Sequence, residues 1–270
     1  MMPILLLALL PAAFQEVPSE QELLVRALAA IAEAKEHAND PTETRAAYIK
    51  AAECYEQLHE RGCRNTDLYR NLGNAYYLGG KLPEAIFAYR RGRALDPDDR
   101  GSRESLDYAR SQIDFSRALA ARPPADDWPP WLPRWTPRLR LLLGAGLLAA
   151  FWITLTRYRM TQHGIHIVTG GLAIIAGLFL LVSVPVEHYF HQRELDKPLV
   201  VVRHDGVDLR TGDGDAYPPR DGFPALRGGT EAELLAEKSD IRGNVWLRIQ
   251  LAGGDTGWIR EADALVDGRP

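Results

Sequence analysis

The stretch LYRNLGNAYYLGGKLPEAIFAYRRGRALDPDD, at residues 68–99, has the pattern of two helices joined by a short turn. Tyr69, Leu72 and Tyr76 follow one another at spacings of three and four residues, so they share one helical face. A Gly-Gly pair interrupts the pattern, and a second apolar stripe continues until Pro97 ends it. The stretch therefore predicts a helical hairpin with one buried face on each helix.

The sizes of the side chains along this hairpin follow a fixed order. That order resembles the signature of the tetratricopeptide repeat, in which small residues let two helices approach closely. A generic amphipathic hairpin would explain the apolar stripes but not this order of sizes. Gly92 stands where the family usually has alanine, at a cost of about 1 kcal/mol in helix propensity. The matching residues are Tyr69, Leu72, Gly73, Tyr76, Ala85, Tyr89, Gly92 and Pro97.

The flanking sequence extends the helical pattern in both directions. Ala51 and Tyr55 precede Ala85 and Tyr89 by one repeat period of 34 residues, which indicates a degenerate first repeat. After the hairpin, the run DDRGSRESLDYARSQIDFSRALA continues as a charged helix, which we expect to cap the array with a polar face. We therefore expect five helices in an all-α repeat domain at residues 20–121.

The first helix of the hairpin carries a candidate docking groove on residues that lie off its packing face. Arg70 and Asn74 are one helical turn apart, so together they could hold a peptide carboxylate or a peptide backbone. Repeats that resemble this one clamp peptide C-termini with a basic residue and an asparagine at these two positions. Ser105 stands where a second basic group would be expected, so a general peptide groove is the prediction and a solvated helix face is the alternative. The groove residues are Asp67, Arg70, Asn74, Tyr77 and Leu78.

The composition is segregated along the chain. With a formal net charge of −4 over 270 residues, nothing global attracts the protein to nucleic acid, and apolar residues concentrate in three runs. The first run, at residues 1–15, ends in small residues and predicts a secretion signal peptide. It carries no Lys or Arg at its start, so an uncleaved N-terminal anchor remains the alternative.

The other two apolar runs, at residues 139–156 and 165–186, predict transmembrane helices that pack as a two-pass hairpin in the lipid bilayer. A linker rich in Pro and Trp, at residues 122–138, precedes them and suits a membrane interface. Arginines flank the first span on both sides, so their count does not decide the orientation. The signal-like N-terminus favours an orientation with both soluble parts on the extracytoplasmic side, because two spans return the chain to the side where it began.

From residue 198 to residue 267 the pattern changes to short strands, including VDLRTG at residues 207–212, which predicts a small all-β barrel. This region resembles the bacterial SH3-like (SH3b) domain. The stretch DGDAYPPRDGFPALRGG, at residues 213–229, replaces a short loop of that family and leaves any ligand groove there undefined. The residues that carry the resemblance are Val207, Leu209, Arg210, Gly212, Trp246, Gly257 and Trp258.

The order of these parts resembles the BatE family of the bacterial aerotolerance (Bat) operon. The resemblance implies a non-catalytic, membrane-anchored scaffold whose partners include von Willebrand factor A-type membrane proteins and a MoxR-type ATPase, in an assembly linked to stress tolerance. The alternative function is an envelope sensor or peptidoglycan binder that uses Trp246, Trp258 and Tyr217 of the barrel as ligand contacts.

The sequence contains no set of residues that signals catalysis. No Gly-rich phosphate loop follows a strand, and no Ser, His and Asp arrangement is indicated. His188 and His191, near Glu187 and Glu194, have a spacing that a metal site could use, but no companion motif accompanies them. We therefore expect a protein that is not an enzyme and that needs neither a metal nor another cofactor.

Overall fold

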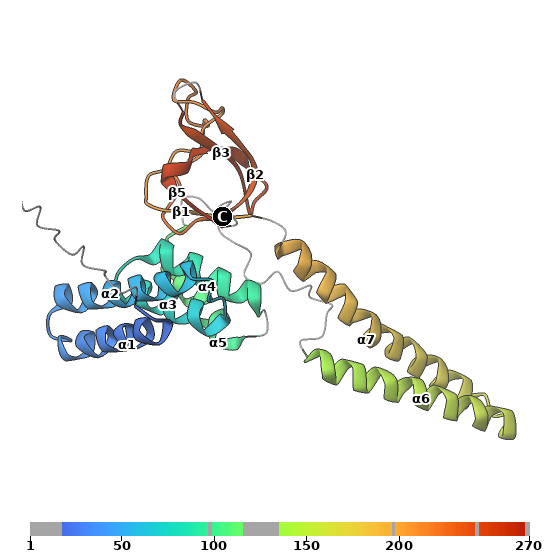
Figure 1. Cartoon of the computed structure of the whole chain (residues 1–270). Coiled ribbons are helices and arrows are strands. Elements are labelled where there is room, and N and C mark those ends of the chain that lie inside the picture. Colours follow the sequence, from blue (N-terminus) through green and yellow to red (C-terminus); the bar gives the residue numbers. More distant parts are fainter. Residues whose placement is uncertain (1–17, 97–98, 116–134, 196–197, 241–242, 268–270) are drawn as a thin grey trace, which may run out of the picture.

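The computed structural model describes residues 18–96, 99–115, 135–195, 198–240 and 243–267, with only the backbone described for residues 190–195. Within these ranges the chain forms five shorter helices, then two long apolar helices, then a five-stranded antiparallel sheet (Figure 1). The predicted signal peptide at residues 1–15 and most of the predicted linker at residues 122–138 lie outside the described residues. The chain is therefore mainly helical, with a small sheet at its C-terminal end.

The five shorter helices, which we call the helical unit, include both helices of the hairpin predicted at residues 68–99. Polar side chains start four of them, because a side-chain oxygen of Ser19, Asp40, Asn65 or Asp99 accepts a hydrogen bond from a backbone N–H of the first turn. Gly62 and Gly80 have positive φ angles just after the second and third helices. The helices are α1 (Glu20–Glu36), α2 (Pro41–Glu60), α3 (Thr66–Leu78), α4 (Leu82–Leu95) and α5 (Arg100–Ser111).

Small residues allow α3 and α4 to pack closely. A Cβ atom at Gly73 would lie 2.4 Å from Cε1 of Tyr89, so only glycine fits beneath that ring. At Gly92 a Cβ would lie 3.3 Å from Cβ of Tyr69. Tyr69, Tyr89, Leu72 and Ala85 are buried, whereas Pro97 lies outside the described residues.

The two long helices, α6 (Pro137–Thr161) and α7 (Ile165–Leu195), are each long and apolar enough to cross a membrane. Little of either apolar segment is buried inside the protein, and the pair extends away from the helical unit (Figure 1). Both helices are longer than the spans predicted at residues 139–156 and 165–186. The chain is thus consistent with a two-pass membrane protein.

Glycines and one buried ion pair join α6 to α7. A Cβ at Gly144 would lie 2.8 Å from Cγ of Leu181, so the two helices touch there through a residue without a side chain. Near the start of α6 the fully buried Arg140 donates to the Ser183 hydroxyl at 3.1 Å and forms an ion pair with Glu187. These contacts set the alignment of the two helices.

The C-terminal strands, which we call the sheet unit, pair in the order β4-β3-β2-β1-β5. A short 3-10 turn after β4 lets the chain cross over so that β5 pairs with β1. Alternate residues of these strands form a buried apolar core. The strands are β1 (Leu199–Val202), β2 (Glu231–Ser239), β3 (Val245–Leu251), β4 (Thr256–Arg260) and β5 (Ala264–Val266).

The predicted strand VDLRTG is wrong. Among the described residues, 207–212 form isolated bridges only: Val207 pairs with Leu226, and Arg210 pairs with Pro219 and with Trp258. Two of these three partners belong to the long segment 213–229, where Pro219 has no N–H to continue a ladder. The segment folds back on residues 207–210, and a continuous strand does not form.

Packing explains most of the residues that carry the SH3b resemblance. A Cβ at Gly212 would lie 2.5 Å from the ring of Tyr217, and a Cβ at Gly257 would lie 2.4 Å from Cγ of Leu209. Arg210 donates to the carbonyl oxygen of Tyr217 at 2.7 Å. Val207, Leu209 and Trp246 are buried, and Trp258 is half-buried. These residues hold the segment 213–229 against the sheet.

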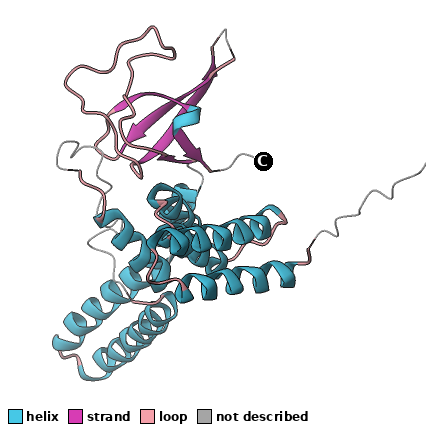
Figure 2. Cartoon of the chain, turned by 90° about the vertical axis from the view of Figure 1, so that its left-hand side faces the viewer, coloured by secondary structure: helices cyan, strands magenta, loops and turns pink. Residues whose placement is uncertain are grey.

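The sheet unit rests against α4 and the C-terminal end of α5, beside the helical unit (Figures 1 and 2). Val201 of β1 belongs to one buried cluster with Ile86 of α4. At the edge of this contact the carboxylate of Glu231, which is 7 % exposed, accepts hydrogen bonds from Arg110 at 2.6 and 2.9 Å. Arg90 lies 3.2 Å from the same carboxylate. We call this group of three residues the interdomain clamp.

The clamp sets the protonation state of its carboxyl group. Burial alone would raise the pKa of Glu231, but the hydrogen bonds and charge of Arg110, with the charges of Arg90 and Arg93, outweigh burial and lower it. The glutamate is therefore more acidic in the folded protein than in the unfolded chain.

Replacing Glu231 by Gln should destabilise the contact between the two units, because two guanidinium groups would lose their buried counter-charge. We expect a loss of about 3–5 kcal/mol in the free energy of unfolding, measured by denaturant unfolding of the full chain in detergent. The matched control is Glu104→Gln, which breaks the exposed ion pair with Arg100 and should change little. Equal effects of the two substitutions would contradict the clamp.

The clamp also predicts how stability depends on pH. Because the pKa of Glu231 is lowered from its usual value of 4.5, its contribution is complete above that value and is lost as the pH falls through the folded-state pKa. The wild-type Tm should therefore fall more steeply below about pH 4.5 than the Tm of Glu231→Gln. Parallel curves for the two proteins would show that Glu231 is not charged in the fold.

Candidate docking groove on helix α3

The predicted groove residues form one strip along α3, on the part of the helical unit that the sheet unit does not cover. The sheet unit contacts α4 and the end of α5, while Leu78 of α3 stays 47 % exposed. Asp67 and Asn74 are exposed as well, and Arg70 and Tyr77 are half-buried. The structure thus brings all five predicted residues to one accessible surface, beside α5.

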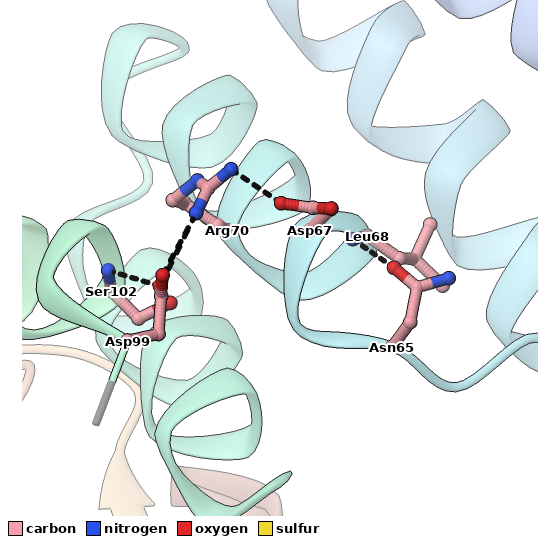
Figure 3. A network of polar contacts seen from close by, with 6 residues as sticks. All are labelled: Asn65, Asp67, Leu68, Arg70, Asp99 and Ser102. Carbon is pink, nitrogen blue, oxygen red and sulfur yellow. Dashed lines mark hydrogen bonds and ion pairs between the residues drawn. The ribbon is translucent and has the colours of Figure 1, made fainter. Parts of the chain in front are cut away.

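Arg70 is engaged within the protein (Figure 3). Its guanidinium donates to Asp67 on the same helix and to both carboxylate oxygens of Asp99 at 3.2 Å. Asp99 also caps α5, since it accepts a hydrogen bond from the Ser102 backbone N–H at 2.7 Å. A Cβ at Gly101 would lie 3.1 Å from Cδ of Arg70, so a glycine makes room for this side chain. Arg70 joins α3 to the start of α5.

These contacts also keep Asp99 ionised. Hydrogen bonding from Ser102 is the main reason that the pKa of Asp99 lies below its usual value, and the Arg70 guanidinium lowers it further, while burial opposes both. The carboxylate therefore stays charged across the neutral range, and the link between α3 and α5 is maintained.

Asn74 is held in one orientation by a buried tyrosine. The Tyr89 hydroxyl donates to Oδ1 of Asn74 at 2.8 Å, and Tyr89 itself is only 2 % exposed. With its oxygen engaged, the amide has its two N–H donors left for the exposed surface of α3. These donors can bind a carbonyl oxygen of a ligand without a prior rearrangement of the side chain.

An aromatic pair borders the groove near the C-terminal end of α3. The rings of Tyr77 and Tyr108 meet edge to face with their centroids 5.5 Å apart, and Tyr108 on α5 is 57 % exposed. With Leu78 they form an apolar end to the strip. Our sequence reasoning did not select Tyr108, although it follows Asn74 by one repeat period of 34 residues, which was an available signal.

The interdomain clamp was also missed, and the sequence holds no signal that could have revealed it. Glu231 and Arg110 are 121 residues apart, and neither belongs to a motif. The contact between these two residues depends on how the sheet unit docks on the helical unit, and the local periodicity of the sequence does not predict that docking.

Trp246, Trp258 and Tyr217 of the sheet unit are the predicted ligand contacts of the alternative function. Two of these three residues are not freely exposed. Trp246 is completely buried in the sheet unit, with the guanidinium of Arg260 over its ring at 5.6 Å. Trp258 is half-buried, and Tyr217 is exposed but covers Gly212. Of these three rings, only that of Tyr217 belongs to an exposed residue.

The predicted histidine pair near the end of α7 is only partly described. His188 is exposed, whereas the side chains of His191 and Glu194 lie outside the described residues. Among the side chains that are described, no group of three or more His, Cys, Asp or Glu residues is placed to hold a metal ion.

Comparisons of the chain with protein-family models, with curated proteins and with solved structures found no match. The geometry of the α3 strip, the two long apolar helices and the sheet unit is therefore the basis for a functional assignment.

Replacing Asp99 by Ala should loosen the start of α5. The substitution removes a helix cap and one of the two anchors of Arg70, so we expect a loss of about 1–2 kcal/mol in unfolding free energy. Hydrogen exchange of the full chain should speed up in the first turn of α5 and around Arg70. The control Asp40→Ala removes the cap of α2 and should change exchange there only; unchanged exchange at Arg70 in the Asp99 variant would contradict the link.

Proposed function

We propose that this protein is a non-enzymatic, membrane-anchored scaffold that binds protein partners. One observation carries the proposal: the sheet unit covers α4, while the groove on α3 remains open with a preset amide and an exposed apolar end. A surface with oriented donors and exposed aromatic and aliphatic side chains suits a peptide segment. The two long apolar helices would keep this surface at the membrane.

The helical unit fits a tetratricopeptide repeat. Each residue of the proposed signature that the structure describes has a packing role that agrees with this assignment, above all Gly73 beneath the ring of Tyr89. Stacked helical pairs of this kind present an extended binding surface on one face. The open strip on α3 and α5 would be that surface.

Some features of the sheet unit support its assignment as an SH3b-type barrel, and one feature departs from that domain. Five short antiparallel strands with a buried Trp246 agree with such a domain. The segment 213–229 departs from it and is held down through Arg210 and Gly212. In our proposal the barrel stabilises the scaffold through the interdomain clamp and offers a second surface for partners.

The order of the parts resembles BatE proteins, and on that resemblance we place the scaffold in a Bat/MoxR-type envelope assembly linked to stress tolerance. Its proposed partners are von Willebrand factor A-type membrane proteins and a MoxR-type ATPase system. The proposed location is the bacterial inner membrane, with both soluble units extracytoplasmic. Contact between the two units agrees with two spans that return the chain to the side it left.

The groove is tested by the double variant Leu78→Lys with Tyr108→Ala, which adds a charge and removes an aromatic side chain at the exposed end. Proteins that co-purify with the full chain from solubilised membranes are quantified by mass spectrometry. We expect recovery of specific partners to fall about tenfold, since central aromatic and aliphatic contacts carry most binding energy.

The matched control is Leu95→Lys, at a leucine of α4 that is 49 % exposed and lies outside the groove. It should leave recovery as in the wild type. Recovery that is equal in all three proteins would remove the groove from the proposal, and the absence of any specific partner would remove the scaffold function itself.

A further inference from the structure

The chemistry of the groove points to a class of ligand, an inference that rests on the proposed scaffold function. The charges at the start of α3 disfavour a free carboxylate. Arg70 already serves two carboxylates, and Arg100 serves Glu104. The side chain of Asp67 is 76 % exposed. Counting Asp67, Asp99 and Glu104 against Arg70 and Arg100 leaves one excess negative charge.

A terminal carboxylate would have to displace Asp67 or Asp99 from Arg70, and it would meet the charge of Asp67 at close range. A basic side chain in the same place would instead pair with Asp67, whose exposed oxygens can accept hydrogen bonds. The start of the groove therefore favours a cation and disfavours a chain end.

In the middle of the groove, Asn74 can bind a peptide backbone. Asn74 has its Oδ1 engaged by Tyr89, so its N–H groups can donate to a carbonyl oxygen of a bound segment. A segment whose carbonyl oxygens are not engaged within a helix offers such acceptors along its whole length, so an extended segment suits this position best.

The length of the strip sets the spacing of the ligand residues. Asp67 and Leu78 are separated by about 16 Å along α3, at 1.5 Å per residue. An extended segment covers that distance in about five steps of about 3.3 Å, so the two ligand residues are about five positions apart. The exposed apolar end, formed by Leu78, Tyr77 and Tyr108, can then receive an apolar side chain from the far end of the segment.

We propose that the groove on α3 binds an internal, extended segment of a partner protein, with a basic residue paired to Asp67 and an apolar residue about five positions away against Leu78, Tyr77 and Tyr108. Asn74 holds a backbone carbonyl between them. The basic and the apolar side chain of the segment provide specificity. A free carboxylate is not selected, because Arg70 is already paired with Asp67 and Asp99.

The test uses the full chain in lipid nanodiscs and a display library of about six randomised residues. Flexible Gly-Ser segments flank the random positions on both sides, so no library member offers a free terminus there. A second library ends in a free carboxylate directly after the random positions. We expect the first library to enrich segments that combine a basic and an apolar residue at opposite ends, with at least tenfold enrichment over empty nanodiscs.

Two variants assign the contacts. Asp67→Lys should reverse the charge preference at the basic position, so that acidic residues are enriched in its place. Asn74→Asp keeps an oxygen for the Tyr89 hydroxyl but removes both N–H donors, and it should weaken binding of an enriched segment about tenfold. The control Glu36→Lys changes an exposed carboxylate at the end of α1 and should leave both the motif and the affinity unchanged.

Three results would overturn the inference: enrichment only in the library with free carboxylates, enrichment whose charge preference is the same in wild type and Asp67→Lys, or no enrichment in either library. If co-purification still depends on Leu78 and Tyr108 in those cases, the scaffold function stands and only the ligand class is wrong. If co-purification also fails, the proposed function falls with it.

Discussion

The carboxylate of Glu231, buried between Arg110 and Arg90, is the interaction on which the arrangement of this protein depends. It joins residues 121 positions apart and closes the sheet unit onto the helical unit across the intervening pair of long apolar helices. A buried ion pair of this kind gives little stability beyond what apolar residues of the same size would provide. It does, however, penalise every docking position in which these charges are not matched, so the sheet unit covers α4 and leaves α3 open.

The parts of the fold that the sequence predicted correctly are those with local periodic signals. The five helices of the helical unit were predicted from the spacing of their apolar residues, and the two long helices from the length of their apolar runs. The small residue expected at position 73 is confirmed, because the ring of Tyr89 leaves no room for a Cβ there. The strand expected at residues 207–212 was wrong because strand pairing depends on distant partners. Here two of the three bridge partners lie in the segment 213–229, which contains prolines and turns, and the third is Trp258 of β4.

In the candidate site, too, the sequence predicted where the residues lie but not which partners they have. Sequence spacing placed Asp67, Arg70, Asn74, Tyr77 and Leu78 on one surface, because a helix imposes that geometry. It could not show that Arg70 is engaged by Asp99 from the next helix, or that Asn74 is oriented by Tyr89. Both contacts depend on tertiary packing. They make Arg70 a structural anchor and Asn74 a fixed hydrogen-bond donor, where the sequence predicted a pair that could hold a peptide carboxylate or a peptide backbone.

The ion pair between Arg140 and Glu187 gives the hairpin a mechanical property. It joins α6 to α7 at the end of the hairpin nearest the soluble units, so the two helices cannot slide or twist past each other there without separating buried charges. Helix α7 runs to Leu195, and β1 begins at Leu199. Four residue steps join these two elements, so the sheet unit stays within about 14 Å of the end of the hairpin wherever the hairpin moves.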